Sequence, residues 1–243
     1  MSQFDTTQWS MVLRTRGGDE GARLALEALC STYRAPVLAY IRHRGYSGDV
    51  AEDLTQAFFA RFLERTYHAE ADPARGRFRA FLLTAIKRFL INADEEAHAV
   101  KRGAHLHFES LESGPGDAHD LATSEIGPEQ AFERTWALVI LDAALSRLRD
   151  EARGAGKGGL FEHLRDFLTE APDDADYARV AAALDMRRNT LAVAVHRMRR
   201  RLRELVLEQI TQTAADRSDL ECELRELRGA FDAVLESDTA TLP

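Results

Sequence analysis

The chain is poor in residues that cross-link a protein or interrupt its helices. Its 243 residues include only two cysteines, Cys30 and Cys222, and six prolines. The cysteines lie far apart, and neither has a second cysteine at metal-ligand spacing, so we expect no disulfide, no zinc site and a reduced, cytoplasmic location. Runs of β-branched residues are few, whereas Ala, Leu, Arg and Glu are abundant. This composition predicts an all-α protein.

Long apolar runs and catalytic patterns are also missing. No run approaches the roughly twenty apolar residues of a membrane-spanning helix, and the opening MSQFDTTQWS lacks the basic and apolar regions of a secretion signal. The glycine-rich stretch 154–159 follows no expected strand and contains no Gly-Lys-Ser/Thr, so it does not predict a phosphate-binding loop. We therefore expect no enzyme, no cofactor and no membrane insertion. Four histidines could suggest a metal site, but they share no defined helical face: His98, His105, His107 and His119.

The clearest pattern that is present lies in residues 177–205, YARVAAALDMRRNTLAVAVHRMRRRLREL. Apolar residues three to four apart predict a short helix, and from Leu191 the spacing resumes over a longer one. Two helices joined by a short turn predict a helix-turn-helix. Asp185 occupies the turn position where glycine is common, and Asp tolerates a left-handed backbone better than most residues.

The same stretch concentrates positive charge on an acidic chain. Residues 177–205 contain eight arginines and two acidic residues, whereas the whole chain has a net charge of −8. A helix-turn-helix places its second helix in the major groove of DNA, so we expect nucleic-acid binding here. The alternative is a charged face that meets only solvent. The residues expected near base edges are Arg187, Arg188, Asn189, Ala192 and Val193, and those expected near phosphates are His196, Arg197 and Arg200.

Composition and periodicity divide the chain into four segments: a first helical domain at 1–102, an acidic linker at 103–128, the helix-turn-helix domain at 129–205 and an acidic extension at 206–243. The helices that we expect before the helix-turn-helix cover 8–15, 19–34, 37–44 beyond a kink or break at Pro36, a helix that begins with a capping box at Asp49 and Glu52, 77–102, 129–151 and 160–170. In the extension, leucines and Phe231 recur every three to four residues. This spacing predicts an amphipathic helix that must pack on something.

Two helices of the first domain differ in charge. The helix from Asp49 is acidic, so its outer face fits either a basic protein partner or only water. The segment 75–102 is basic and interleaves Arg with Phe at its start, as in Arg77, Phe78 and Arg79. That mixture suits unpaired bases, because rings stack on bases while Arg holds the backbone. The alternative is that the phenylalanines belong to the hydrophobic core.

Three blocks in this order resemble the sigma factors of bacterial RNA polymerase, specifically the small two-domain extracytoplasmic-function (ECF) class. AEDLTQAFFARFLER (51–65) is similar to the family's core-polymerase-binding helix. DPARGRFRAFLLTAIKRFLIN (72–92) is similar to its strand-opening segment, which reads the minus-ten element. Residues 177–205 resemble the helix-turn-helix that reads the minus-thirty-five element. FDTTQWSMVL (4–13) also resembles the opening of a subgroup of such factors.

The resemblance implies a function and two partners. The domains would be a sigma region 2 bundle and a sigma region 4 helix-turn-helix, and the extension would be an addition to them. The partners would be promoter DNA and the clamp coiled coil of the largest subunit of core RNA polymerase, with an anti-sigma or other regulatory protein as a possible third. The residues implied for core polymerase are Asp53, Gln56, Phe59 and Arg61. Those implied for the minus-ten element and the single strand are Arg75, Arg77, Phe78, Phe81, Lys87, Arg88 and Asn92.

The resemblance leaves two questions open. Asp185 and Arg187 replace the usual glycine and serine of the turn, and Ala192 and Val193 are apolar where the family often has polar residues, so the promoter sequence is not predicted. The alternative function is a stand-alone helix-turn-helix regulator, which would not need residues 49–92. The acidic extension could fold back over a DNA-binding surface and inhibit it, or it could only stabilise the C-terminal domain.

Overall fold

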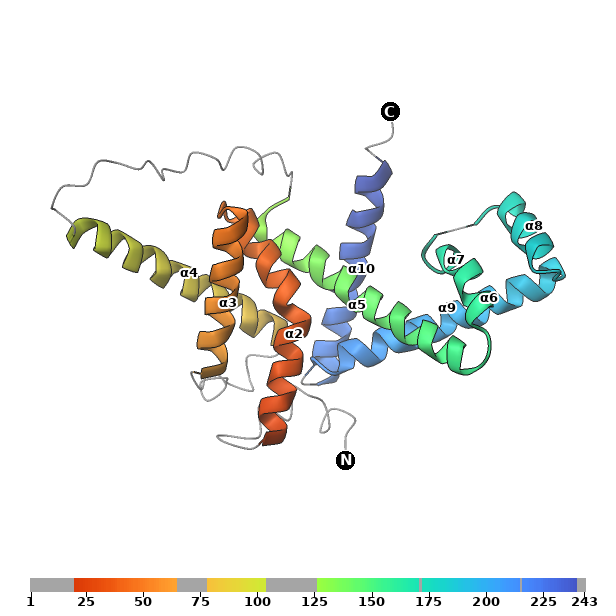
Figure 1. The fold of residues 1–243 in the computed structure, drawn as a ribbon, viewed down its shortest axis with the longest axis horizontal. Coiled ribbons are helices and arrows are strands. Elements are labelled where there is room, and N and C mark those ends of the chain that lie inside the picture. Colours follow the sequence, from red (N-terminus) through yellow and green to blue (C-terminus); the bar gives the residue numbers. More distant parts are fainter. Residues whose placement is uncertain (1–19, 65–77, 104–125, 171, 215, 240–243) are drawn as a thin grey trace. The chain divides into compact units, whose positions relative to one another are not determined.

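The computed structural model describes residues 20–64, 78–103, 126–170, 172–214 and 216–239 (Figure 1). Within these ranges the chain forms helices and no strand, which confirms the predicted all-α class. The expected helix over 8–15 and the central part of the acidic linker lie outside the described residues. The helices are α2 (Glu20–His43), α3 (Gly48–Glu64), α4 (Phe78–Gly103), α5 (Pro128–Gly154), α6 (Gly158–Leu164), α7 (Asp166–Thr169), α8 (Asp174–Ala183), α9 (Arg188–Thr211) and α10 (Arg217–Thr239).

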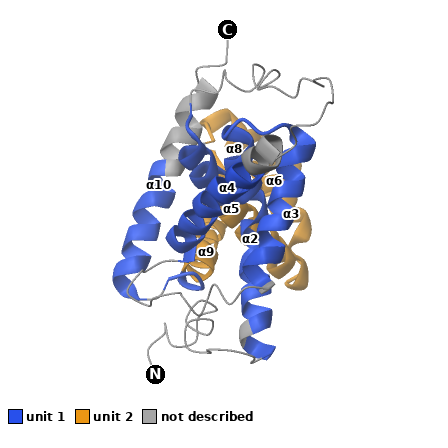
Figure 2. Ribbon diagram, turned by 90° about the vertical axis from the view of Figure 1, so that its left-hand side faces the viewer, with its two compact units in different colours: residues 1–137, 211–243 blue, residues 138–210 orange. Residues whose placement is uncertain are grey.

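The chain folds as two compact units, coloured separately in Figure 2. The first unit comprises residues 1–137 together with 211–243, and the second comprises residues 138–210. The first unit is therefore discontinuous in sequence, because α10 packs with the N-terminal helices. None of the described helices is both long and apolar enough to cross a lipid bilayer.

The core of the first unit is rich in aromatic rings. Tyr33 of α2 is fully buried, with its ring centroid 5.0 Å from that of Phe78 and 6.2 Å from that of Phe132. Phe58 of α3 packs edge-on against Phe89 of α4 at 5.5 Å. These contacts join α2, α3, α4 and the start of α5 around one interior.

Helix α2 runs through Pro36 without ending, so of the predicted kink or break at this residue the break is wrong. A proline inside a helix removes one hydrogen bond and costs about 3 kcal/mol. Tyr33 before it and Val37 and Ile41 after it are all fully buried. Because burial of each such side chain contributes about 1.5–3 kcal/mol, the shared core offsets the cost of the proline.

Helix α3 begins one residue before the predicted start, at Gly48, and the Ala51 amide donates to the Ser47 carbonyl at 2.8 Å. The predicted capping box needed the Glu52 side chain at the helix start. That carboxylate instead accepts hydrogen bonds from Arg34 at 2.8 Å and Arg42 at 3.2 Å. Two arginines on α2 therefore determine the position of Glu52, and they hold α3 against α2.

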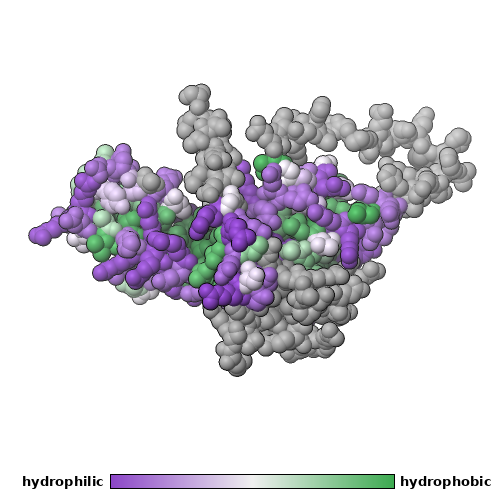
Figure 3. All heavy atoms as spheres, turned by 180° about the vertical axis from the view of Figure 1, so that it is seen from behind, coloured by the Kyte–Doolittle hydropathy of each residue, from purple (hydrophilic) through white to green (hydrophobic). Residues whose placement is uncertain are grey.

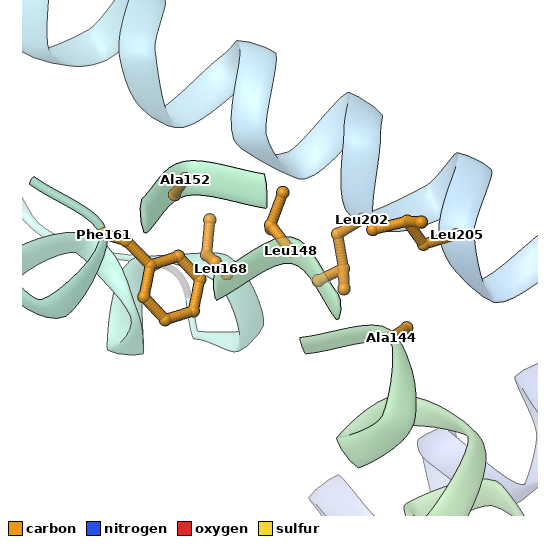
Figure 4. Packing of buried hydrophobic residues seen from close by; sticks show 7 residues of the cluster. All are labelled: Ala144, Leu148, Ala152, Phe161, Leu168, Leu202 and Leu205. Carbon is orange, nitrogen blue, oxygen red and sulfur yellow. The ribbon is translucent and has the colours of Figure 1, made fainter. Parts of the chain in front are cut away.

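The second unit is built on two apolar clusters. One joins α5, α6, α7 and α9 (Figure 4), and the other joins α6, α7, α8 and α9. The single helix predicted over 160–170 is divided at Arg165 into α6 and α7. The buried members of the first cluster are Ala144, Leu148, Ala152, Phe161, Leu168, Leu202 and Leu205. Those of the second are Leu164, Phe167, Val180, Ala181, Leu191 and Val195.

Candidate nucleic-acid and polymerase interfaces

Helix α8, a short turn and α9 cover the segment that the sequence predicts as a helix-turn-helix. Two aspartates and one turn residue determine its local geometry. Asp173 accepts a hydrogen bond from the Asp176 amide at 2.8 Å, and Asp176 accepts one from the Asp173 amide at 3.3 Å, which makes a capping box. In the turn, Asp185 has a φ of 49°, the left-handed backbone that we predicted there. The Met186 amide then donates to the Ala181 carbonyl at 2.9 Å, which closes the turn before α9 begins.

The outer face of α9 presents the predicted recognition residues to solvent. Leu191 and Val195 are buried on the opposite face and hold α9 against α8 and α7. Val193 is 49% exposed. All eight predicted residues are exposed: Arg187, Arg188, Asn189, Ala192, Val193, His196, Arg197 and Arg200.

The arginines of α9 fall into two sets that the sequence does not distinguish. Arg199 donates to the backbone carbonyls of Phe167 at 2.8 Å and Glu170 at 2.6 Å, so it holds α7 in place. Arg201 pairs with Glu151 of α5 through two hydrogen bonds of 2.9 Å, and these bonds lower the pKa of the Glu151 carboxyl. The remaining arginines point outward. They include Arg203, which is exposed and one turn beyond Arg200, and which the sequence-based list omitted.

Arg188 differs from the other recognition residues because it already has an anionic partner. Its guanidinium pairs with the Asp174 carboxylate at the start of α8. The Asp174 side chain is 89% exposed, so the pair is open to solvent and exchangeable. A base contact by Arg188 therefore requires that it leave Asp174.

The outer face of α3 combines a carboxylate, an amide and apolar side chains. Asp53 and Gln56 are exposed one turn apart, and Val50 and Leu63 are 47% and 37% exposed. Asp53 has no ion-pair partner within the described part of the chain, unlike Glu52. An acidic group among exposed apolar side chains is suited to a basic protein surface with apolar contacts around it.

The other two residues predicted for polymerase contact flank this face and are half-buried. The Phe59 ring packs edge-on against that of Phe58 at 5.1 Å between centroids. Arg61 pairs with Glu96 of α4 at 3.4 Å and lies 5.9 Å from the centroid of the Phe89 ring. On the outer face of α3, Asp53 and Gln56 are therefore exposed to solvent. Phe59 and Arg61 lie beside them and already contact other residues of the first unit.

Helix α4 corrects one of the predicted single-strand contacts. Phe78 is fully buried against Tyr33 and Phe62, so its ring is a core residue and presents no face to a base. Phe81 is half-buried, with its ring centroid 5.8 Å from that of Phe62, and keeps part of its surface at the outside. The alternation of Arg and Phe in the sequence does not show which of the two rings is buried, because nearby residues of a helix point in different directions.

The basic residues of α4 also differ in their surroundings. Arg88 and Asn92 are exposed one turn apart on the same side of α4 as Phe81. Lys87 is exposed but pairs with Glu129 of α5 at 2.9 Å, an interaction that raises the pKa of Lys87 and lowers that of Glu129. Arg75 and Arg77 lie outside the described residues. Of the predicted residues that the structure describes, Phe81, Arg88 and Asn92 lie on one side of α4, and we call these three residues the α4 surface.

One hydrogen bond ties α4 to the start of α3. The Tyr46 hydroxyl, in the turn between α2 and α3, donates to Asp94 of α4 at 2.7 Å. Burial and this bond to the Asp94 carboxylate together raise the pKa of Tyr46 to about 12. The bond links the turn that precedes α3 to α4 within the first unit.

The second unit thus has a basic helix with an exposed outer face, and the first unit has an acidic helix with exposed apolar side chains next to a basic helix. Hydrophilic residues cover much of the visible molecular surface (Figure 3). In the comparison with known families, residues 29–94 match sigma-70 region 2. The matched segment spans most of α2, all of α3 and the first two-thirds of α4. It supports a sigma-70 family sigma factor, with a role in RNA polymerase binding and promoter melting. No curated protein and no solved structure gave a significant match to the chain.

Proposed function

We propose that this protein is a sigma factor of the extracytoplasmic-function type, which binds core RNA polymerase, recognises a promoter and opens it. The observation that carries the proposal is the sigma-70 region 2 match over α2, α3 and α4. The helix-turn-helix in the second unit supports the finer assignment, because it supplies a separate surface for duplex DNA. The protein makes and breaks no bond in this role, since the polymerase carries out the chemistry.

The outer face of α3 is the proposed contact with the clamp coiled coil of the largest polymerase subunit. Asp53 at its centre would pair with a basic residue of the coiled coil, and the exposed Val50 and Leu63 would add apolar contact. Such a pair sets the orientation of docking and raises the association rate. The acidic character of α3 excludes it from DNA, so the protein and nucleic-acid partners meet different helices.

The two DNA contacts are proposed to differ in kind. The exposed face of α9 would enter the major groove of the minus-thirty-five element, with Asn189 and Val193 near base edges and Arg197 and Arg200 near phosphates. The α4 surface would hold the non-template strand after melting, with Phe81 against a base and Arg88 on the backbone. Duplex recognition and single-strand capture therefore reside in separate units.

The proposal is tested by capture of core RNA polymerase with the tagged full-length chain. Asp53→Arg is expected to weaken capture at least tenfold, because it places like charges across the proposed contact. Asp142→Arg is the matched control. It makes the same charge change at an exposed site of α5 in the second unit, and it should leave capture unchanged.

Transcription by the reconstituted holoenzyme on a pool of random promoters then identifies the sequences that are read. A chain that binds duplex DNA but never captures core polymerase would instead be a stand-alone helix-turn-helix regulator. In that outcome, Asp53→Arg would have no effect on DNA binding either.

A further inference from the structure

The ion pair between Arg188 and Asp174 connects the first turn of α9 to the first turn of α8 within the second unit. It joins the Arg188 Nη2 atom to the Asp174 Oδ1 atom, across 14 positions of the chain. The Arg188 side chain is 51% exposed and that of Asp174 is 89% exposed. One partner therefore belongs to the predicted recognition residues, and the other is an exposed carboxylate of the preceding helix.

Asp174 differs from its two neighbouring aspartates because it takes no part in the capping of α8. Asp173 accepts a hydrogen bond from the Asp176 amide, and Asp176 accepts one from the Asp173 amide and pairs with Arg179 at 2.8 Å. A negative charge in the first turn favours a helix through its dipole, whichever cation is nearby. The capping box therefore leaves the Asp174 carboxylate available to Arg188.

Arg187 provides a comparison within the same segment, because Arg187 and Arg188 are the two charged residues among those predicted near base edges. Arg187 is exposed, and it has no ion-pair partner within the described part of the chain. Arg188 has the carboxylate of Asp174. The two arginines therefore differ in what is available to them inside the protein when a base pair offers no suitable acceptor.

We propose that Asp174 determines how strictly Arg188 reads a base pair, by giving its guanidinium a second partner inside the protein. The inference rests on the proposed function, in which α9 enters the major groove. At a guanine, whose O6 and N7 atoms accept two hydrogen bonds from an arginine, Arg188 leaves Asp174 and binds the base. At other bases Arg188 stays with Asp174, so its guanidinium is not left without a hydrogen-bond acceptor in the interface.

This competition lowers the affinity for the preferred base and also reduces the penalty for the others. Loss of the Asp174 charge should raise the affinity for the preferred base about two- to fivefold, the strength of an exposed ion pair. At other bases the pair is present in both the free and the bound protein, so its loss changes the affinity less. Repulsion between this carboxylate and DNA phosphates acts on all sequences alike, so it leaves the ratio between bases unchanged.

The test selects duplexes from a pool of random sequence with full-length variants, without polymerase, and sequences the bound fraction. The position read by Arg188 is the one whose base preference is lost in Arg188→Gln. There, Asp174→Asn should increase the ratio of the preferred base to the others about two- to fivefold. Asp174→Ser, which removes the charge with a different side chain, should give the same result.

Two double variants provide the controls. Combined with Arg188→Gln, Asp174→Asn should change no base preference, because the residue through which it acts is missing. Combined with Arg187→Gln, it should still give the increase. Circular dichroism establishes that each variant is folded, since Asp174 also lies in the first turn of α8.

Three outcomes would overturn the proposal. They are an unchanged or weaker base preference in Asp174→Asn, an increase that persists in the Arg188→Gln background, and a selected pool in which no base preference depends on Arg188. Core polymerase is absent from all these selections. Failure to capture core polymerase would therefore refute the sigma-factor proposal separately and leave the result on Asp174 in place.

Discussion

Arg201 of α9 donates two parallel hydrogen bonds to Glu151 of α5, with Nε–Oε2 and Nη2–Oε1 distances both of 2.9 Å. Its neighbour Arg200 is 70% exposed and lies 3.8 Å from Glu204 at its nearest approach. Two adjacent arginines thus differ in their surroundings. Arg201 links α9 to α5 within the second unit, whereas Arg200 faces solvent. A helix turns by about 100° per residue, so neighbours in sequence point in different directions.

Because Arg201 and Arg200 differ in this way, the same substitution at the two positions should change different properties of the protein. Arg201→Gln should lower the free energy of unfolding by about 1–2 kcal/mol, because a bidentate charge-assisted pair is lost at a partly exposed site. Arg200→Gln should leave stability within about 0.5 kcal/mol and reduce the salt dependence of DNA binding by about one unit of slope. Urea unfolding and DNA titrations at several salt concentrations measure the two effects. The assignment fails if both variants change the same quantity.

The left-handed turn at Asp185 predicts the effect of substitution in the helix-turn-helix. Its φ of 49° costs an L-residue about 1–2 kcal/mol, less for Asp than for a branched side chain. Asp185→Gly should be neutral or raise the free energy of unfolding by up to about 1 kcal/mol, whereas Asp185→Val should lower it by about 1–2 kcal/mol. Thermal unfolding followed by circular dichroism measures both. Equal melting temperatures for the Gly and Val variants would contradict the assigned backbone.

Phe78 and Phe81 are expected to respond differently to truncation although they lie three residues apart. Phe78→Ala should cost about 3–5 kcal/mol of stability, because its fully buried ring leaves a cavity against Tyr33. Phe81→Ala should cost less, and it should weaken binding to a single strand by about 1–3 kcal/mol if its exposed surface stacks on a base. Unfolding and oligonucleotide binding are measured on both variants. Unchanged single-strand affinity of Phe81→Ala would remove that residue from the α4 surface.

Burial of Cys30 predicts an unreactive thiol and a loss of stability in alkali. Burial, with a smaller contribution from Glu27, raises the pKa of Cys30 from 9.0 to about 12. Because the folded state binds this proton more tightly than the unfolded state, the stabilisation is complete below about pH 9 and is lost as the pH rises towards 12. Unfolding at several alkaline pH values measures it, with Cys30→Ala as the control that lacks this titration.

Alkylation at pH 8 checks the same site independently. The half-exposed Cys222, whose Sγ donates to Glu226 at 3.6 Å, serves as the internal reference within one chain. Mass spectrometry of iodoacetamide-treated native protein should find Cys222 modified before Cys30. Comparable rates at the two thiols would show that α2 opens readily around Cys30.

The sequence predicted the second unit better than the first, and the reason is the range of the interactions involved. In the helix-turn-helix, the apolar spacing and Asp185 act within a few residues of one another, so the exposed face of α9 could be derived from periodicity alone. The same reasoning left open whether Pro36 ends the helix, and it placed the Glu52 side chain wrongly. Whether a helix passes through a proline, and where Glu52 points, depend on a core and on arginines supplied by other segments.

The single-strand residues show the same limit. Alternating Arg and Phe at the start of α4 indicated a basic aromatic segment, but not that Phe78 would be buried, or that Arg79 would be enclosed by Glu133, Glu223 and Glu226. Those carboxylates come from α5 and α10, far along the chain. No local pattern marks them as partners of Arg79.

The sequence by itself determined the helical class, the turn at Asp185 and the outward face of α9, because helical periodicity and backbone preference are properties of neighbouring residues. Only the tertiary structure decided that Arg201 binds Glu151 and that α10 joins the first unit at Arg79. Side chains of the same type receive different roles through burial and charged partners, and both are supplied by segments that meet only when the chain has folded.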